Sequence, residues 1–330
     1  MNRKDDHIQY AYAQPSKIND FDLIKFVHHA FPEINEADID LSVSIFQKRF
    51  PLPFYINAMT GGSEQAKTLN ERFAMLAKHF NIPLATGSVS AAIKNPSLIE
   101  TFTVIRKVNP DGFVIANVGA GQTVENAKKA IQLLNANALQ IHVNAVQEVV
   151  MPEGDRDFAG WLSSIQKIKE QISIPLIVKE VGFGMSKKTI SQLMKIGVDM
   201  IDMAGQGGTN FAVIENQRRT QKLNSFDDWG ISTVQSLINA KAYPQAQIIA
   251  SGGIRNPLDV VKSLALRAKI VGLSGYFLHL VKDYTHEQAI EKLNQFIEEI
   301  KMIMLVLGKK NIVSLKEADL IVPSSLSQSI

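Results

Sequence analysis

The 330-residue sequence contains no cysteine. Without thiol groups the chain can form no disulfide, no thiolate nucleophile, and no zinc or iron–sulfur site with cysteine ligands. Several classes of enzyme are therefore excluded by one missing residue type. The absence of cysteine also gives no indication of secretion, because disulfides are typical of small secreted domains.

Long apolar runs and an excess of one charge are also missing. No apolar window approaches the roughly 20 residues of a membrane-spanning helix, and the charged start at residues 1–7 does not resemble a signal peptide. The chain has 35 lysines and arginines against 32 acidic residues, and the net charge of +3 is too balanced for a general nucleic-acid surface. We therefore expect a cytoplasmic protein that binds neither membranes nor nucleic acids and meets anionic ligands through local clusters.

The sequence does contain enough apolar residues, 45% against 20% charged, for a large α/β core. Short apolar runs typical of strands alternate with stretches of helical spacing. The eight runs cover residues 54–57, 83–86, 113–116, 138–141, 175–178, 199–202, 247–250 and 268–271. Eight strand–helix units in about 250 residues are typical of a TIM (β/α)8 barrel. An open, doubly wound sheet is the alternative, because counting strands does not reveal whether a sheet closes.

The segments outside the strands complete the expected organisation. We expect an N-terminal extension, the barrel and a C-terminal tail at residues 1–53, 54–309 and 310–330. The extension would hold a helix near residues 20–28 and an extended piece near 39–45, and it would act as a lid or as a plug at the bottom of the barrel. The last helix would cover residues 287–307, and we expect the chain to fray from Ser324.

Glycine-rich and polar residues follow most of the expected strands, at the rim where TIM barrels bind their ligands. The loops after the last two strands, residues 251–255 and 272–275, contain small residues that let backbone N–H groups close around a phosphate. Each loop opens a helix whose N-terminus favours an anion. Arg255 would add a bidentate clamp. A single loop of this kind is more often a tight turn, but two in adjacent units indicate a phosphate site.

One apolar strand turns abruptly polar at its end. His142, Asn144, Gln147 and Glu148 supply an imidazole, two amides and a carboxylate within seven residues. A site at the exit of the strand is one interpretation, and an ordinary solvated loop is the other.

Lys179 and the basic residues at the start of the chain also have two interpretations each. Lys179, at the end of the fifth strand, either forms a salt bridge or faces a flavin ring, where it would stabilise negative charge on the reduced pyrimidine end; we favour the flavin. Arg3, Lys4 and His7 belong to a charged start of the kind that is usually disordered. Their functional role would be to close over a diphosphate with charge-assisted hydrogen bonds.

Longer motifs carry a specific resemblance that spans nearly the whole chain. They comprise residues 3–8, 57–62, 87–88, 142–148, 152–158, 179–184, 207–209, 229–233 and 252–255. In these motifs the chain closely resembles the type 2 isopentenyl-diphosphate isomerases, flavin enzymes built on a TIM barrel. The chain departs from the family pattern in two places, at Val89-Ser90 and at Ser274. Val89 and Ser90 stand where many relatives carry Gln-Arg, so a phosphate contact is missing, and Ser274 is often an alanine.

The resemblance implies a set of binding residues. FMN would be lined by Ala58, Met59, Thr60, Ser88, Asn117, Lys179 and Thr209, with Gly252, Gly253, Arg255, Ser274 and Gly275 on its phosphate. The diphosphate of a prenyl substrate would be held by Arg3, Lys4, His7, His142 and Asn144. Glu148 would bind a Mg²⁺ ion bridged to that diphosphate, since magnesium accepts a lone carboxylate completed by water and phosphate oxygens. Gln147 would contact the substrate and face the reacting alkene as the catalytic residue. Relatives form homotetramers or larger assemblies, so we expect a homo-oligomer.

The implied reaction interconverts isopentenyl diphosphate and dimethylallyl diphosphate in isoprenoid biosynthesis. It would be redox-neutral, with reduced FMN as the active form and NADPH needed only to reduce it. A strong nucleophile would trap the cation, so the lack of thiols and the neutral amide of Gln147 suit the chemistry. The missing cysteine excludes the unrelated type 1 isomerase.

Two rival functions remain at this point. An FMN-dependent oxidoreductase such as a 2-hydroxy-acid oxidase shares the barrel, but it needs a histidine base with paired arginines, and no such pattern follows the sixth strand. A non-catalytic flavin-binding or sensing barrel is the second.

Overall fold

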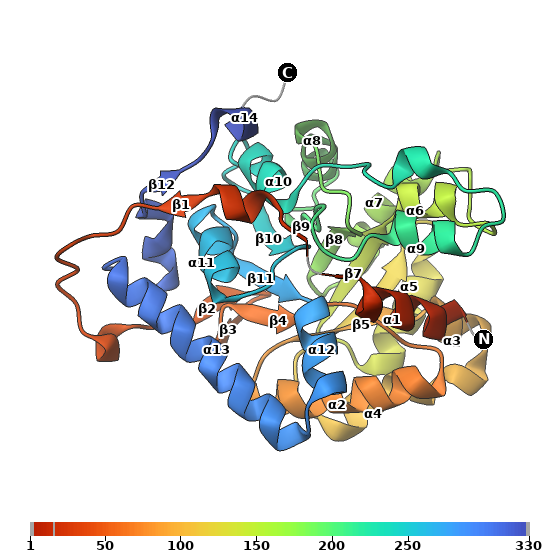
Figure 1. The fold of residues 1–330 in the computed structure, drawn as a ribbon. Coiled ribbons are helices and arrows are strands. Elements are labelled where there is room, and N and C mark those ends of the chain that lie inside the picture. Colours follow the sequence, from red (N-terminus) through yellow and green to blue (C-terminus); the bar gives the residue numbers. More distant parts are fainter. Residues whose placement is uncertain (1–2, 16, 328–330) are drawn as a thin grey trace.

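Eight parallel strands form a closed barrel in the computed structural model, which describes residues 3–15 and 17–327, with only the backbone of Arg3 and Ser327 (Figure 1). The strands are β4 Phe54–Ile56, β5 Leu84–Ser88, β6 Val114–Gly119, β7 Ala138–Val143, β8 Leu176–Glu180, β9 Met200–Asp202, β10 Gln247–Ser251 and β11 Ile270–Leu273. They follow one another in sequence order, and β11 closes the barrel by pairing with β4, where Gly272 lies opposite Tyr55. The predicted TIM barrel is confirmed, and the open sheet is excluded.

Helices between the strands surround the barrel. They are α2 Glu64–Phe80, α3 Ser90–Lys94, α4 Glu100–Val108, α5 Val124–Leu134, α6 Ala145–Val150, α7 Trp161–Gln171, α8 Lys187–Lys195, α9 Phe211–Gln217, α10 Thr233–Ala240, α11 Pro257–Ala265, α12 Gly275–Asp283 and α13 His286–Val306. In α2, for example, the Ser63 hydroxyl accepts from the backbone N–H of Ala66 at the start, and Asn81 adopts the left-handed conformation at the end. The long helix α13 begins and ends within one residue of the predicted bounds, 287–307.

The upper interior of the barrel is polar. TIM barrels usually fill this space with branched apolar side chains. Here Asn57, Asn117, Gln140 and Asp202 are buried inside the barrel, each almost inaccessible to solvent. Because buried polar groups are costly unless they are hydrogen-bonded, this layer must form an internal network.

The bottom of the barrel is closed by a hairpin of β2 Val43–Ile45 and β3 Lys48–Phe50. Phe46, in the turn of this hairpin, stacks on Phe113 with ring centroids 5.4 Å apart, and Phe50 meets the same ring edge-on at 5.2 Å. The extended piece expected near residues 39–45 is therefore part of a bottom plug.

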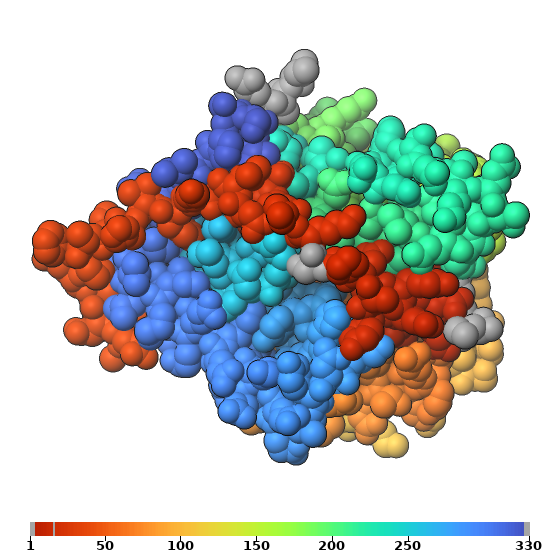
Figure 2. All heavy atoms as spheres, viewed as in Figure 1, coloured from red at the N-terminus to blue at the C-terminus, as the bar shows by residue number. Residues whose placement is uncertain are grey.

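The mouth of the barrel is crossed by α1 Arg3–Ala13, which contacts α2, α9 and α12. Figure 2 shows this first segment, in red, lying across the face of the molecule. Gln14 and Asn210 hydrogen-bond each other twice, at 2.8 and 3.0 Å, and Tyr12 donates to Asp283 Oδ1 at 2.5 Å. The N-terminal extension thus supplies both a lid and a plug.

The prediction of a helix at residues 20–28 is wrong. Only a 3-10 turn, η1 Asp20–Leu23, forms there, and β1 Lys25–Phe26 follows it. The chain is drawn into an extended conformation because β1 pairs antiparallel with β12 Leu320–Ile321, a contact that local sequence cannot reveal.

The prediction that the chain frays from Ser324 is also wrong for residues 324–327, the last that the structure describes. After η5 Ile312–Glu317 and β12, the short helix α14 Ser324–Ser327 packs on α10, and Leu326 is buried. Across residues 3–15 and 17–327, no helix combines the length and apolar character that crossing a membrane requires.

Candidate active site

A single cavity of about 720 Å³ lies at the mouth of the barrel, where the strands end. Its volume is in the range of small-molecule and cofactor sites. The expected site residues that line it are Lys4, His7, Ala58, Met59, Thr60, Ser88, Asn117, His142, Asn144, Gln147, Glu148, Lys179, Thr209, Gly252, Gly253, Arg255, Ser274 and Gly275. The side chain of Arg3 lies outside the described part of the structure.

The loop after β9, at Gly207 and Gly208, and the loop after β10, at Gly252 and Gly253, approach each other too closely for side chains. A Cβ atom on Gly208 would lie 2.6 Å from the backbone nitrogen of Gly253, and Gly252 and Gly253 have φ angles of +89° and +71°. Such a conformation is open mainly to glycine. Beside them, α12 begins at Gly275, so its first N–H groups face the cavity wall without intrahelical partners. This end of the cavity has the chemistry of a phosphate cradle.

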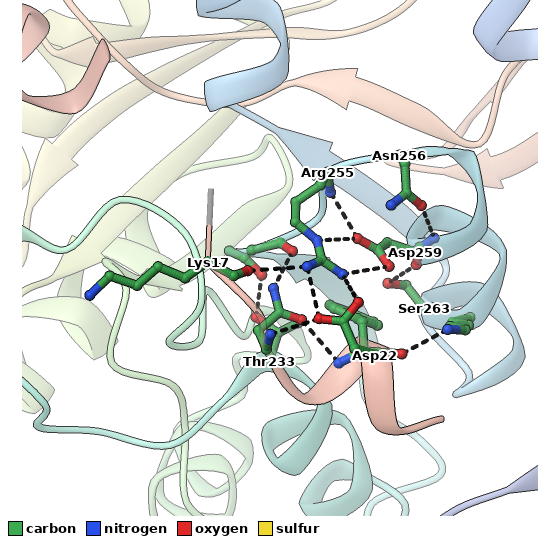
Figure 3. Close-up of polar contacts among 12 residues, drawn as sticks. Lys17, Asp22, Thr233, Arg255, Asn256, Asp259 and Ser263 are labelled. Atoms are coloured by element: carbon green, nitrogen blue, oxygen red, sulfur yellow. Dashed lines mark hydrogen bonds and ion pairs between the residues drawn. The ribbon is translucent and has the colours of Figure 1, made fainter. Parts of the chain in front are cut away.

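Arg255 supports the cradle through carboxylates (Figure 3). Its guanidinium donates to Asp22 Oδ1 and Oδ2 at 2.7 and 2.9 Å and to Asp259 Oδ2 at 2.9 Å. Weaker bonds to Asp259 Oδ1 and to the carbonyl of Lys17 engage the remaining N–H groups. The guanidinium beside Asp22 lowers the pKa of that carboxyl to about 2. The sequence predicts that Arg255 holds a phosphate with two hydrogen bonds, and in the structure it makes this bidentate contact with Asp22.

The segment around η1 forms a strap over the phosphate cradle, which we define as residues 17–23. Asn19 Nδ2 donates to the carbonyl of Gly253 at 2.9 Å, and Lys262 donates to the carbonyl of Phe21 at 2.7 Å. Asp20 accepts from the hydroxyl of Ser232. Sequence reasoning missed this strap, because none of its residues belongs to a recognisable loop motif.

Thr60 and Lys179 are two buried polar residues in the lining of the cavity. Thr60 is buried, and its hydroxyl has no hydrogen-bond partner among the described residues. Lys179 is also buried, and its ammonium group donates to the carbonyl of Glu180 at 2.6 Å. An unsatisfied buried hydroxyl is costly, so Thr60 is suited to a polar atom of a ligand.

The opposite end of the cavity is basic. Lys4 and His7 enter it from α1, and His142 and Lys179 enter it from adjacent strands, with His142 opposite Lys179 in the register. Burial, together with the charges of Lys4 and Lys179, lowers the pKa of His142 to about 3, although a backbone hydrogen bond with Val118 acts in the other direction. An anion brought to this end would be attracted by the positive charges of Lys4 and Lys179.

The polar strand exit forms a short bonded series. Asn144 Nδ2 donates to Gln147 Oε1 at 3.2 Å and to Glu148 Oε1 at 3.0 Å. Glu148 Oε2 accepts from the backbone N–H of Asp155 at 2.8 Å. Over the described ranges, no group of three or more His, Asp or Glu residues could hold a metal ion by itself. A cation at Glu148 would therefore need ligands from a substrate and from water.

Glu215 is a site residue that sequence reasoning missed. It is fully buried on α9 and accepts from Gln147 Nε2 at 3.0 Å, while His7 Nε2 lies 2.9 Å from its Oε1. Its other oxygen pairs with Arg218 at 2.5 Å. Burial alone would raise the pKa of Glu215, but its partners His7, Gln147 and Arg218 outweigh burial and lower it to about 2. The available signal was a lone carboxylate between the apolar residues of a short rim helix.

Comparison with known proteins agrees with this geometry. A family described as FMN-dependent dehydrogenase matches residues 104–322. Two solved structures share the fold: a flavocytochrome b2 variant with sulfite bound (TM-score 0.72, 19% identity, 98% of this chain and 84% of that one) and a mandelate oxidase variant (0.68, 15%, 97% and 96%).

Sequence relatives are much closer. The isopentenyl-diphosphate delta-isomerase of Latilactobacillus sakei is 48% identical over 98% of this chain and 94% of its own length. The proteins of that name from Staphylococcus epidermidis and Staphylococcus aureus strain JH9 are 45% and 47% identical, over 98% and 97% of this chain and 94% and 92% of their own lengths. The chain therefore belongs to the type 2, FMN-dependent family of isopentenyl-diphosphate delta-isomerases.

Proposed function

We propose that the protein interconverts isopentenyl diphosphate and dimethylallyl diphosphate, with reduced FMN and Mg²⁺ bound and with NADPH as the reductant of the flavin. The observation that carries this proposal is the division of one cavity into a phosphate cradle at Gly252–Gly253 and a basic end at Lys4, His7 and His142. A flavin phosphate suits the first end and a prenyl diphosphate suits the second. Gln147 and Glu148 line the same cavity. The family relationship supports the same assignment.

The residues at the cradle fit FMN. Backbone N–H groups of Gly252, Gly253 and Gly275 would hold its phosphate, and at Gly252 and Gly253 no side chain could be accommodated. The unsatisfied hydroxyl of Thr60 offers a bond to the ring, and Lys179 would place a cation beside its pyrimidine end. Arg255 would act indirectly, by holding the strap and the loop in place through Asp22 and Asp259.

The basic end suits a diphosphate chelated by magnesium. Lys4, His7 and His142 would neutralise the phosphate oxygens, and Glu148 would supply the one protein carboxylate for the ion. The bond from Asn144 and the N–H of Asp155 hold that carboxylate in one orientation. The α1 lid would exclude water from the bound substrate.

Gln147 is the residue we assign to the reacting end of the prenyl chain. Its amide nitrogen is directed at Glu215 and its oxygen at Asn144, so the group is oriented on both sides. A neutral amide does not trap a carbocation, and the chain contains no cysteine that could do so. Reduced FMN, when bound, supplies an electron-rich surface against developing positive charge and an exchangeable proton at its N5.

An FMN-dependent oxidoreductase is the second candidate, favoured by the family match over residues 104–322 and by the flavocytochrome b2 and mandelate oxidase folds. The loop that follows β9 carries Gln206, Gly207, Gly208 and Thr209. It contains neither a histidine nor an arginine for a hydroxy-acid substrate. Steady consumption of NADPH in proportion to product would favour this candidate.

The deciding experiment uses the purified protein with its flavin. The protein is examined for a flavin spectrum, reduced anaerobically, and mixed with isopentenyl diphosphate and Mg²⁺ in deuterated water while isomer formation is followed by NMR. We expect dimethylallyl diphosphate with incorporated deuterium and no net oxidation of the flavin. Reduced protein that leaves the substrate unchanged would instead indicate a flavin-binding barrel without this activity. We also propose a cytoplasmic homo-oligomer, a tetramer or larger, which light scattering would test.

A further inference from the structure

A directed series of hydrogen bonds crosses the inside of the barrel and ends at His142. Asn57 Nδ2 donates to Asp202 Oδ2 at 2.9 Å, and Gln140 Nε2 donates to Asn57 Oδ1 at 3.3 Å. Asn117 Nδ2 donates to Gln140 Oε1 at 2.7 Å. At the far end, His142 Nδ1 lies 2.8 Å from Asn117 Oδ1. The series therefore links a cavity residue to Asp202, which does not line the cavity.

Asp202 and the backbone N–H of Ala58 fix the direction of this series at one end. Asp202 is completely buried, and its Oδ1 accepts from the hydroxyl of Ser251 at 2.5 Å and from the backbone N–H of Ala204 at 3.3 Å. Its Oδ2 accepts from the hydroxyl of Tyr55 at 3.2 Å and from Asn57 Nδ2. The backbone N–H of Ala58 donates to Asn57 Oδ1 at 2.8 Å, so both neighbours of Asn57 require its nitrogen to face Asp202.

The orientation then passes from one amide to the next. With the nitrogen of Asn57 directed at Asp202, its oxygen faces Gln140, which must donate with its own nitrogen. The oxygen of Gln140 then accepts from Asn117, and the oxygen of Asn117 is left for His142. An amide oxygen accepts but does not donate, so the hydrogen between Asn117 and His142 must lie on Nδ1 of the imidazole.

We propose that Gln140 is a positioning residue that, held by Asn57 and in turn orienting Asn117, keeps His142 in the Nδ1–H form and leaves Nε2 without a proton. Gly119 lies beside Nε2, and a Cβ atom on Gly119 would be 3.4 Å from it. The consequence for the substrate rests on the proposed function. An unprotonated Nε2 cannot donate to a phosphate oxygen, so His142 takes up a proton when a diphosphate binds beside Lys4 of α1.

The proposal is tested by the tautomer of His142 in the oxidised holoenzyme, without substrate. Nitrogen-15 NMR of histidine-labelled protein distinguishes a protonated Nδ1 from a protonated Nε2, and a His142→Gln variant assigns the signal. We expect the proton on Nδ1. In Gln140→Leu, the amide of Asn117 loses the partner that fixes its orientation, so it can present either its oxygen or its nitrogen to Nδ1. We expect the Nδ1–H form of His142 to lose its dominance and the Nε2–H form to appear.

A double variant supplies the control. In Gln140→Leu with Asn117→Asp, a carboxylate that can only accept lies next to His142, so we expect the proton to return to Nδ1. The flavin spectrum of each variant verifies that the barrel is folded. A wild-type proton on Nε2, or a Gln140→Leu protein in which His142 keeps only the Nδ1–H form, would overturn the proposal. Isomer formation is measured separately, so a protein with the expected tautomer but no isomerase activity would refute the proposed function and leave the positioning role intact.

Discussion

The side-chain nitrogen of Gln147 donates to Oε1 of Glu215 at 3.0 Å, and Glu215 is completely buried. The oxygen of Gln147 accepts from Asn144, so both ends of the amide are occupied. Glu215 is in turn held by Arg218 and lies beside His7 of the lid. The residue assigned to the reacting alkene is therefore connected through Glu215 to α1, the helix that covers the cavity.

The Gln147→Ala variant should lose most of its turnover and keep its flavin. Removing an oriented polar group at the reacting centre commonly costs about two orders of magnitude or more in rate. The phosphate cradle is untouched, so the protein should remain yellow. Turnover is measured with reduced enzyme and flavin content by absorbance. Gln166→Ala, on the exposed face of α7, is the matched control and should turn over normally. If Gln147→Ala also turns over normally, the assignment of Gln147 is wrong.

The Glu215→Gln variant should alter the dependence of stability on pH. The folded-state pKa of about 2 is below the ordinary value of 4.5, so the unfolded chain binds more protons between these values. The stabilisation of the folded state by ionised Glu215 is complete above about pH 4.5 and is lost as the pH falls towards 2. For a pKa shift of this size it amounts to about 3 kcal/mol.

Urea unfolding of both proteins between about pH 3 and pH 7 checks this expectation. The difference in unfolding free energy between wild type and Glu215→Gln should be largest near neutrality and should shrink below pH 4.5. A difference that does not change with pH would show that Glu215 titrates normally.

Binding of inorganic diphosphate with Mg²⁺ should be accompanied by proton uptake at His142. The pKa of this imidazole is about 3, because it is buried and lies near Lys4 and Lys179, so it is neutral at physiological pH. A bound anion raises this pKa, and affinity should therefore fall as the pH rises through the value in the complex.

Calorimetry in two buffers of different ionisation enthalpy measures the protons exchanged. Subtracting the result for His142→Gln removes the ligand's own protonation. Equal proton exchange in wild type and in His142→Gln would contradict the role of His142.

The Asp22→Asn variant should bind FMN more weakly. The carboxylate makes two bonds to Arg255, but its side chain is 40% exposed, so the pair is worth about 1 kcal/mol after solvent screening. A loss of that size corresponds to roughly a fivefold increase in Kd. Titration of flavin-free protein with FMN measures the change. Asp38→Asn, which removes a similarly exposed pair with Lys310, is the control and should leave the Kd unchanged.

The barrel and most of the cavity lining could be predicted from the sequence because their signals are local. Short apolar runs alternate with helical spacing, and strand ends such as His142 bring polar residues to the same rim by topology alone. The closure of the sheet required the pairing of β11 with β4, which links residues near opposite ends of the chain.

The remaining features depend on contacts between distant segments. The extended conformation after Leu23 follows from pairing with β12, and Asp22 gains its role only when Arg255 lies beside it. Glu215 reaches Gln147 from a different rim loop. The internal series did leave a trace in the sequence, since Asn117 and Asp202 interrupt otherwise apolar strands, but their partners could not be assigned without the register.

The pairing of β1 with β12 ties the strap to residues 320–321, near the carboxyl terminus. The N–H of Val27 also donates to the carbonyl of Asp319 at 2.9 Å. Deleting the chain from Leu320 onward would remove no cavity residue, yet it would release one anchor of the segment that holds Gly253 and Arg255. A carboxyl-terminal truncation should therefore weaken flavin retention from outside the cavity, by loosening the strap.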